Sequence, residues 1–203
     1  MSNESRRRFL EKSVFLLGMG GLGYLFYQNG KKRFSEWRRD FLDKITNFDH
    51  TPRDLRPLPT DTDYLAFLDN LHLKYFTAKE IIQVHSRWRG DVQNDLPPRE
   101  LWFEIENTLR IADLLRDRLG VTCKILSAYR SKKYNTAVGG AKFSQHMQNR
   151  ALDLKFSCSS TKVYEAAMKL REEGLFQGGI GWYPNFVHID TRGRNVEWGR
   201  EEG

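Results

Sequence analysis

The chain has 203 residues, of which 39% are hydrophobic and 13% aromatic, so it is long enough for one folded domain and too apolar for a disordered protein. Its formal net charge of +7 is concentrated at one end, because residues 1–39 contain nine basic and three acidic side chains, whereas residues 40–203 contain 24 and 23. The nearly neutral remainder argues against a nucleic-acid-binding surface.

The N-terminus has the layout of an export signal. Arginines at positions 6–8 precede an uncharged stretch, Ser13 to Asn29, that contains several leucines and phenylalanines. A basic segment followed by an apolar one is typical of secretory signals. The run from Ser5 to Lys12 resembles a twin-arginine (Tat) signal, because it matches the pattern Ser-Arg-Arg-x-Phe-Leu-x-Lys at every fixed position. The alternative is an ordinary Sec-dependent signal-anchor.

Two fates of this signal, residues 1–30, are open. No Ala-x-Ala-like cleavage site occurs between Leu22 and Phe34, which favours retention as an inner-membrane anchor. The apolar stretch of about 15 to 17 residues is at the short limit for crossing ~30 Å of hydrocarbon. The basic residues that follow it also oppose the positive-inside bias. We therefore expect export to the periplasm or cell envelope through the Tat translocase, as a soluble or an anchored protein.

Residues 31–60 are predicted to be a connector, and the folded domain is expected over residues 61–203. Prolines at positions 52, 57 and 59 interrupt any helix in the connector. The domain begins with helical patterns, first from Tyr64 to Leu71 and then from an N-cap at Thr77 to His85. The longest helix is predicted to open at Pro97-Pro98 and to end at Gly120.

After Gly120 the sequence changes to short β-like runs. These runs cover residues 124–128, 151–156, 186–190 and 195–198. A further helix separates the second run from the third, with Ser159 or Ser160 as its cap and Gly174 at its end. Helices followed by a small antiparallel sheet indicate an α+β domain.

Three polar residues in this second part have the types and spacing of a metal site. His146 and Asp153 are seven positions apart, and His188 follows 35 residues later. Two imidazoles and a carboxylate are ligands that Zn²⁺ accepts, and three protein ligands leave a fourth position for water. Such a metal activates water and polarises a carbonyl group, which favours hydrolysis of an amide.

The remaining cysteines and histidines are not expected to bind metal. Cys123 and Cys158 are 35 positions apart and belong to no Cys/His cluster. They are predicted either to form a disulfide, which an exported protein permits, or to remain free thiols. We interpret His50, His72 and His85 as surface or packing residues.

The segments around the three ligands resemble the M15 metallopeptidases, especially the Tat-exported murein endopeptidases. The similarity covers roughly residues 61–200 and rests on several motifs in the same order. These are Ser127-Ala128-Tyr129-Arg130-Ser131, Tyr134-Asn135 with Val138-Gly139-Gly140-Ala141, Ser144-Gln145-His146-Met147, Arg150-Ala151-Leu152-Asp153, Gly178-Gly179-Ile180-Gly181 and Phe186-Val187-His188-Ile189-Asp190-Thr191-Arg192-Gly193.

The resemblance implies a Hedgehog/DD-peptidase fold with zinc bound by His146, Asp153 and His188. Arg130 matches the arginine thought to bind the carboxylate or carbonyl oxygen of the substrate, which suits a guanidinium beside a metal. The implied function is hydrolysis of peptide cross-links in peptidoglycan. The alternatives are a DD-carboxypeptidase and a non-catalytic zinc-containing module that binds the wall.

Two positions depart from the family pattern. Asn149 replaces the usual glycine between the first histidine and the aspartate, and asparagine also tolerates a left-handed backbone. Asn185 stands where many relatives have the acid three residues before the last histidine, and an amide cannot accept the proton. Asp190 is the substitute candidate for the general base, because it shares a strand face with His188. The alternative role of Asp190 is to orient His188.

Overall fold

The computed structural model describes residues 64–199 of the chain. The predicted signal or anchor and the predicted connector lie outside these residues. Within residues 64–199, the structure contains no helix that is both long enough and apolar enough to cross a membrane.

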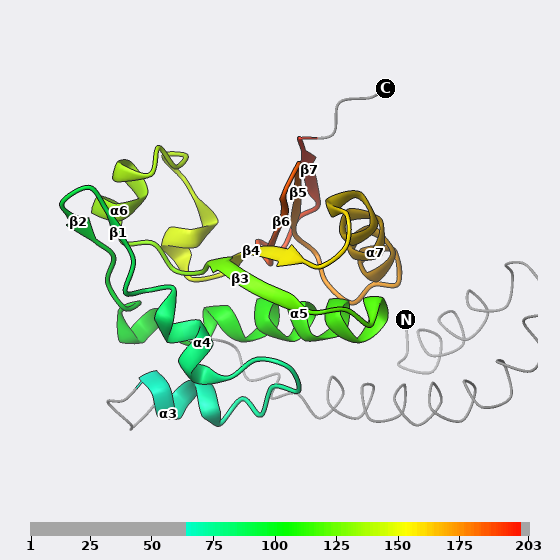
Figure 1. The fold of residues 1–203 in the computed structure, drawn as a ribbon, viewed down its shortest axis with the longest axis horizontal. Coiled ribbons are helices and arrows are strands. Elements are labelled where there is room, and N and C mark those ends of the chain that lie inside the picture. Colours follow the sequence, from blue (N-terminus) through cyan, green and yellow to red (C-terminus); the bar gives the residue numbers. More distant parts are fainter. Residues whose placement is uncertain (1–63, 200–203) are drawn as a thin grey trace, which may run out of the picture. The chain divides into compact units, whose positions relative to one another are not determined.

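The described elements follow the predicted order of helices first and strands afterwards (Figure 1). They are α3 (Tyr64–Asp69), α4 (Ala78–Gln83), β1 (Trp88–Arg89), β2 (Val92–Gln93), the 3₁₀ helix η2 (Arg99–Leu101), α5 (Glu104–Leu119), β3 (Cys123–Ser127), α6 (Lys132–Ala137), the 3₁₀ helix η3 (Gln145–Gln148), β4 (Ala151–Phe156), α7 (Ser160–Glu172), β5 (Gly179–Tyr183), β6 (Phe186–Asp190) and β7 (Val196–Trp198).

The main sheet has five strands in the order β3-β4-β6-β5-β7. Strands β3, β4, β6 and β5 pair antiparallel with their neighbours, and β7 pairs parallel with β5. Strands β1 and β2 form a separate antiparallel hairpin. The predicted α+β class is therefore confirmed, with β7 as the one parallel addition to the expected antiparallel sheet.

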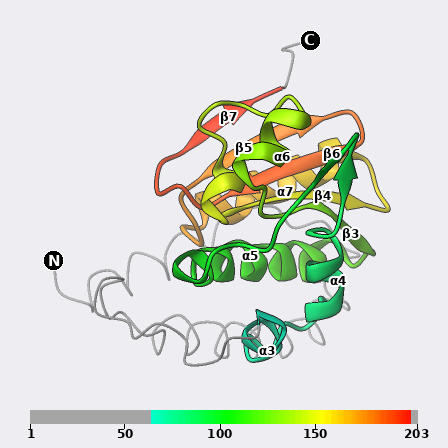
Figure 2. The ribbon, with the colours of Figure 1, turned by 90° about the vertical axis from the view of Figure 1, so that its left-hand side faces the viewer.

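The two faces of the main sheet have different roles. One face packs on α7, which contacts β4, β5 and β6, and on α5, which contacts β4 and α7. Its side chains are almost completely buried, and they include Leu152, Leu154, Ile180, Val187 and Ile189. Figure 2 shows α6 in front of the strands and α7 behind them. Because side chains alternate along a strand, Asp153 and His188 point away from the α7 side.

The predicted helix ends are confirmed where a capping residue marks them. Thr77 accepts from the backbone of Glu80, whose side chain accepts from the backbone N–H of Thr77, and this capping box opens α4. Ser159 caps α7. Gly120 adopts a left-handed backbone with φ 64° and ends α5, as glycine at this position favours.

The opening of the longest helix is a correction. We predict it at Pro97-Pro98, but the structure has the short helix η2 after the prolines, and α5 begins only at Glu104. The indole nitrogen of Trp102 donates to the carbonyl oxygen of Pro97 at 3.0 Å. Trp102 is buried, and it caps the 3₁₀ turn that precedes the α-helix.

Sequence reasoning also missed β5 and the β1–β2 hairpin. Strand β5 begins in a glycine-rich run that is typical of a loop, and β1 and β2 have only two residues each.

The structure distinguishes the two predictions for the cysteines. Cys123 and Cys158 are both free thiols, and they do not form a disulfide.

Candidate metal centre

Two of the three predicted ligands are direct neighbours across the sheet. Asp153 of β4 pairs with His188 of β6, and the same row continues to Ser127 of β3 on one side and Gly181 of β5 on the other. Residues that are paired in register project from the same face at about 5 Å spacing. The register of the sheet therefore places the carboxylate of Asp153 beside the imidazole of His188.

The third ligand comes from the 3₁₀ helix before β4. The side chain of Ser144 accepts from the backbone of His146 and caps η3. Asn149 then turns the chain into β4 with a left-handed backbone, at φ 51° and ψ 32°. The prediction that asparagine can replace glycine at this turn is confirmed. The turn brings His146 over the sheet to the Asp153–His188 pair.

The three side chains meet at one point. Nε2 of His146 lies 3.2 Å from Nδ1 of His188 and 3.2 Å from Oδ1 of Asp153. Nδ1 of His188 lies 2.9 Å from the same carboxylate oxygen. Zinc bonds of ~2.0–2.1 Å in tetrahedral geometry place neighbouring ligand atoms roughly 3.3–3.4 Å apart. The observed triangle is close to that size.

The outer nitrogens of both histidines fix their tautomers. Nδ1 of His146 lies 2.6 Å from the carbonyl oxygen of Ala128, which can only accept, so Nδ1 carries the hydrogen. Nε2 of His188 lies 3.0 Å from the carboxylate of Asp190 and carries its hydrogen for the same reason. The inner nitrogens therefore present lone pairs to the carboxylate of Asp153. With both histidines neutral, three electron-pair donors face one another, so the set fits a metal ion, and without a metal a proton on Nδ1 of His188 can take its place.

Charge and burial act in opposite directions on these groups. The ligands are at most 7% exposed. Burial lowers the pKa of His146 below its ordinary value. Burial also disfavours charge on the other two groups, but the carboxylates of Asp153 and Asp190 outweigh it and raise the pKa of His188. The two histidines likewise outweigh burial and lower the pKa of Asp153 far below its usual range. These shifts show that the cluster favours an ionised Asp153 with a positive charge beside it.

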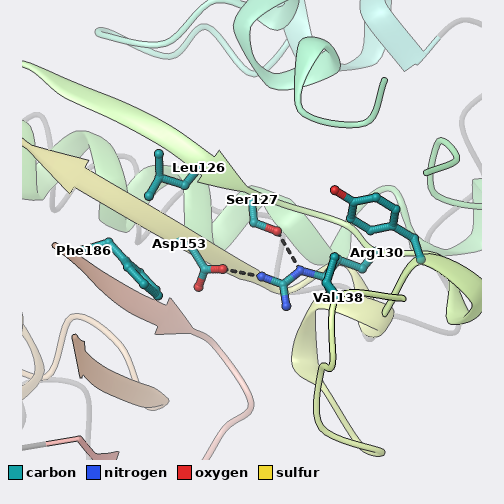
Figure 3. A pocket seen from close by; sticks show the side chains of 7 residues that line it. Leu126, Ser127, Arg130, Val138, Asp153 and Phe186 are labelled. Atoms are coloured by element: carbon teal, nitrogen blue, oxygen red, sulfur yellow. Dashed lines mark hydrogen bonds and ion pairs between the residues drawn. The ribbon is translucent and has the colours of Figure 1, made fainter. Parts of the chain in front are cut away.

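Arg130 lies beside the cluster and contacts one of the ligands. Its Nε donates to the hydroxyl of Ser127 at 2.8 Å, and its Nη2 forms an ion pair with Oδ2 of Asp153 (Figure 3). Asp153 therefore uses Oδ1 toward the two histidines and Oδ2 toward the guanidinium. The pair leaves Nη1 of Arg130 directed away from Ser127 and Asp153 (Figure 3).

A cavity of about 230 Å³ adjoins Arg130 and is more open than enclosed. Its polar lining is formed by Ser127, Arg130 and Asp153, and its apolar lining is formed by Leu126, Tyr134, Val138 and Phe186. Leu126 and Phe186 lie on one flank of the polar groups and Val138 on the other (Figure 3). Tyr134, Val138 and Phe186 belong to motifs that resemble the M15 peptidases, but no sequence pattern indicates that they line a cavity. A cavity with charged groups between apolar flanks can bind a peptide group next to a small side chain.

Asp190, the substitute candidate for the general base, and Asn185, which replaces the family's acid, lie in contrasting places. Asp190 is fully buried, bonded to Nε2 of His188, and paired with the guanidinium of Arg192. Burial disfavours its charge, but His188 and Arg192 outweigh burial and lower the pKa of Asp190 well below its usual range. Asp190 therefore contacts Nε2 of His188, whereas Asp153 and His146 contact Nδ1 on the opposite side of the same ring. Asn185 is exposed in the turn between β5 and β6.

One neighbour of the centre gave no signal in the sequence. The ring of Trp198 in β7 lies 5.1 Å from the ring of His188 and occupies the space above Gly181. A Cβ atom added at Gly181 would lie 2.5 Å from Cε2 of this ring, which explains the glycine. The indole nitrogen of Trp198 donates to the hydroxyl of Tyr183 at 3.0 Å.

Comparison with known proteins adds one finding. The model of a family described as Peptidase M15 matches residues 74–190, which are 117 of the 203 residues. The matched span contains all three ligands and Arg130. No curated protein and no solved structure matches the chain significantly.

Proposed function

The chain belongs to the M15 family of peptidases, and from that premise we propose that it is a zinc-dependent endopeptidase that hydrolyses peptide cross-links of peptidoglycan. The observation that carries this proposal is the meeting of three lone pairs, from His146, Asp153 and His188, beside the cavity of Arg130. Family membership supports a metallopeptidase, and the choice of zinc and of a wall peptide is our proposal.

The ligand set would bind zinc through Nε2 of His146, Oδ1 of Asp153 and Nδ1 of His188. Zinc at such a site supplies a water of lowered pKa and a Lewis acid for the scissile carbonyl. The protein contributes a fixed geometry. The carbonyl oxygen of Ala128 and the carboxylate of Asp190 lock the two imidazoles with their lone pairs directed inward.

Arg130 binds the substrate in this proposal. Because Nε and Nη2 bond to Ser127 and Asp153, the guanidinium is held rigidly and Nη1 faces the substrate. A fixed N–H donor stabilises negative charge as it develops on a carbonyl oxygen. The side chain of Arg130 is 18% exposed, so a peptide in the cavity can reach it.

We assign Asp190 to the orientation of His188. A general base must lie within hydrogen-bonding reach of the water that it deprotonates. Asp190 is instead fully buried and shares its oxygens among His188, Arg192 and the backbone N–H of Gly179. These contacts suit a group that holds an imidazole in one orientation.

The openness of the cavity supports an endopeptidase over a DD-carboxypeptidase. A carboxypeptidase must recognise the end of a chain, and an enclosed pocket with Arg130 at its closed end would suit that task. The cavity beside Arg130 opens to solvent, which leaves room for a peptide that continues past the scissile bond. We therefore favour a cross-link over a terminal D-alanine as the substrate.

Digestion of purified sacculi tests this proposal. The full-length protein is loaded with zinc, incubated with sacculi, and the muropeptides are separated by chromatography and identified by mass spectrometry. We expect cross-linked dimers to fall to monomers, and the product masses to identify the bond. Chelation should stop the reaction, and added zinc should restore it.

Two other products would redirect the proposal. Loss of one terminal D-alanine with dimers intact would show a DD-carboxypeptidase. Binding of sacculi without any change in the muropeptides would show a wall-binding module, and the loss of the family's acid at Asn185 would then explain the inactivity. His188→Ala is the matched negative control for both.

We further propose that the chain reaches this substrate by Tat-dependent export, with residues 1–30 as the signal or inner-membrane anchor. The support is the match of Ser5 to Lys12 to the twin-arginine pattern. Replacing Arg6 and Arg7 by lysine should retain the protein in the cytoplasm, as measured by fractionation. Continued export would instead indicate a Sec-dependent signal-anchor.

A further inference from the structure

The loop that carries Arg130 is irregular and needs support from outside. Residues 127–131 follow a register shift between Ile125 and Ser127, where β3 leaves its regular pairing with β4. On one side, η3 supports the loop, because the backbone N–H of Arg130 donates to the carbonyl oxygen of His146 at 3.1 Å. The direction of the Arg130 side chain depends on the two peptide groups that flank its Cα atom.

A single buried asparagine binds both of these flanking residues. Nδ2 of Asn94 donates to the carbonyl oxygen of Tyr129 at 2.9 Å. Oδ1 of Asn94 accepts from the backbone N–H of Ser131 at 2.9 Å. Asn94 is only 5% exposed, so water does not replace these bonds easily. The rigid amide plane therefore fixes the backbone immediately before and immediately after Arg130.

Asn94 is itself anchored at the base of the β1–β2 hairpin. Its backbone N–H donates to the carbonyl oxygen of Arg87 at 2.9 Å, which closes the hairpin. The guanidinium of Arg87 in turn donates to the carbonyl oxygen of Leu126, at the start of the irregular segment. The hairpin also contacts α6, which begins directly after Ser131. Two side chains at the base of the hairpin, Asn94 and Arg87, thus make three hydrogen bonds to the backbone of residues 126–131.

We propose that Asn94 is a positioning residue for Arg130, and that the β1–β2 hairpin is the support through which it acts. This inference rests on the proposed function, because it gives Asn94 its importance through the substrate contact of Arg130. An asparagine is required chemically, since the site needs one donor and one acceptor in one plane. Aspartate cannot donate to Tyr129, and alanine loses both bonds.

A double-mutant cycle on the full-length, zinc-loaded protein tests the coupling. Asn94→Ala should lower kcat/KM for a cross-linked muropeptide dimer by about 10- to 100-fold, because a small displacement of a catalytic group has effects of this size. In an Arg130→Ala background, Asn94→Ala should have almost no further effect. If the two losses multiply instead, Asn94 does not act through Arg130 and the proposal is overturned.

A second readout does not depend on activity. The Nε–H signal of Arg130, assigned by its loss in Arg130→Lys, is followed by ¹H–¹⁵N NMR in the zinc-loaded protein. Asn94→Ala should shift this signal and accelerate its exchange with solvent. An unchanged signal would overturn the proposal, and this result remains decisive even if the wild-type protein cleaves no muropeptide.

Asn135→Ala is the matched control. Asn135 is also a buried asparagine, and its Nδ2 donates to the carbonyl oxygen of Ala141, in the segment after α6. Its replacement should lower the melting temperature and leave the Nε–H signal of Arg130 in place. If Asn94→Ala does not fold, Asn94→Asp gives the same comparison, because it keeps the shape and the bond from Ser131 but loses the donor to Tyr129.

Discussion

The predicted metal ligands and Arg130 lie in contact, yet the chain positions them in different ways. Asp153 and His188 are paired in the register of two central strands, so their placement follows from the sheet itself. Arg130 lies in a loop after a register shift, and side chains from a distant hairpin support that loop. We call Asp153, His188 and His146 the metal half of the site, and Arg130 with its loop and cavity the substrate half. Regular sheet structure positions most of the metal half, whereas individual tertiary contacts position the substrate half.

This difference teaches where each half can vary. A change of register would move Asp153 to the other face of the sheet, so the metal half tolerates almost no rearrangement. The substrate half can change its loop and cavity while the strands stay intact. Changes in the two halves should therefore have separable effects on metal binding and on turnover.

The largest effect should follow from removing a ligand. His188→Ala should abolish both stoichiometric zinc binding and hydrolysis, because only His146 and Asp153 would remain as protein ligands. Zinc content after dialysis, measured by mass spectrometry, checks this directly. Arg130→Ala is the comparison, and we expect it to retain zinc while losing turnover. Equal loss of zinc in both variants would remove the distinction between the two halves.

Asp190→Asn tests whether Asp190 orients His188 for metal binding. If Asp190 orients His188, the variant should bind zinc about 10- to 100-fold more weakly, because partners of ligating histidines have effects of this size. Competition with a chelating dye measures the affinity. Unchanged affinity together with lost turnover would instead favour Asp190 as the general base. Asn185→Ala, in the exposed turn, should alter neither quantity.

The same division explains how much the sequence could reveal. Strands β4 and β6 begin and end at the predicted residues, and the ligands stand in motifs with fixed spacing. Strand β5 could not be predicted, because its Gly179 and Gly181 are required by packing against Asp190 and Trp198, which come from later strands. Asn94 is one polar residue in a polar stretch, and its two bonds arise only from the tertiary fold.

Gly181→Ala tests the packing behind His188 with a smaller effect. The new methyl group would overlap the ring of Trp198, so we expect the free energy of unfolding to fall by about 1–3 kcal/mol. Denaturant unfolding of the zinc-loaded protein measures the loss. Adding Trp198→Leu should recover part of it by making room. If Gly181→Ala is as stable as the wild type, the close approach of this ring is not structurally important.

The last prediction concerns the pH dependence of stability at His85, beside the loop of Arg130. His85 is 2% exposed and packs between Tyr64 and Tyr129, and burial lowers its pKa to about 4. Because the unfolded chain binds this proton near pH 6.5 and the folded chain does not, stability is complete above pH 6.5 and is lost as the pH falls toward 4. The loss is at most ~1.4 kcal/mol per pH unit.

Comparison with His85→Gln isolates this contribution, because the carboxylates and metal ligands titrate in both proteins. The difference in unfolding free energy should be constant above pH 6.5 and should shift in favour of the variant below it. Parallel curves from pH 7.5 to 4.5 would show that His85 takes up its proton equally in the folded and unfolded states.

The central claim is that His146, Asp153 and His188 form one zinc site through specified atoms. A crystal structure of the zinc-loaded protein, with anomalous data collected on both sides of the zinc absorption edge, tests it most directly. We predict one strong anomalous peak that contacts Nε2 of His146, Nδ1 of His188 and Oδ1 of Asp153 at about 2.0–2.2 Å. A peak at other residues, or none between these three atoms, would contradict the account.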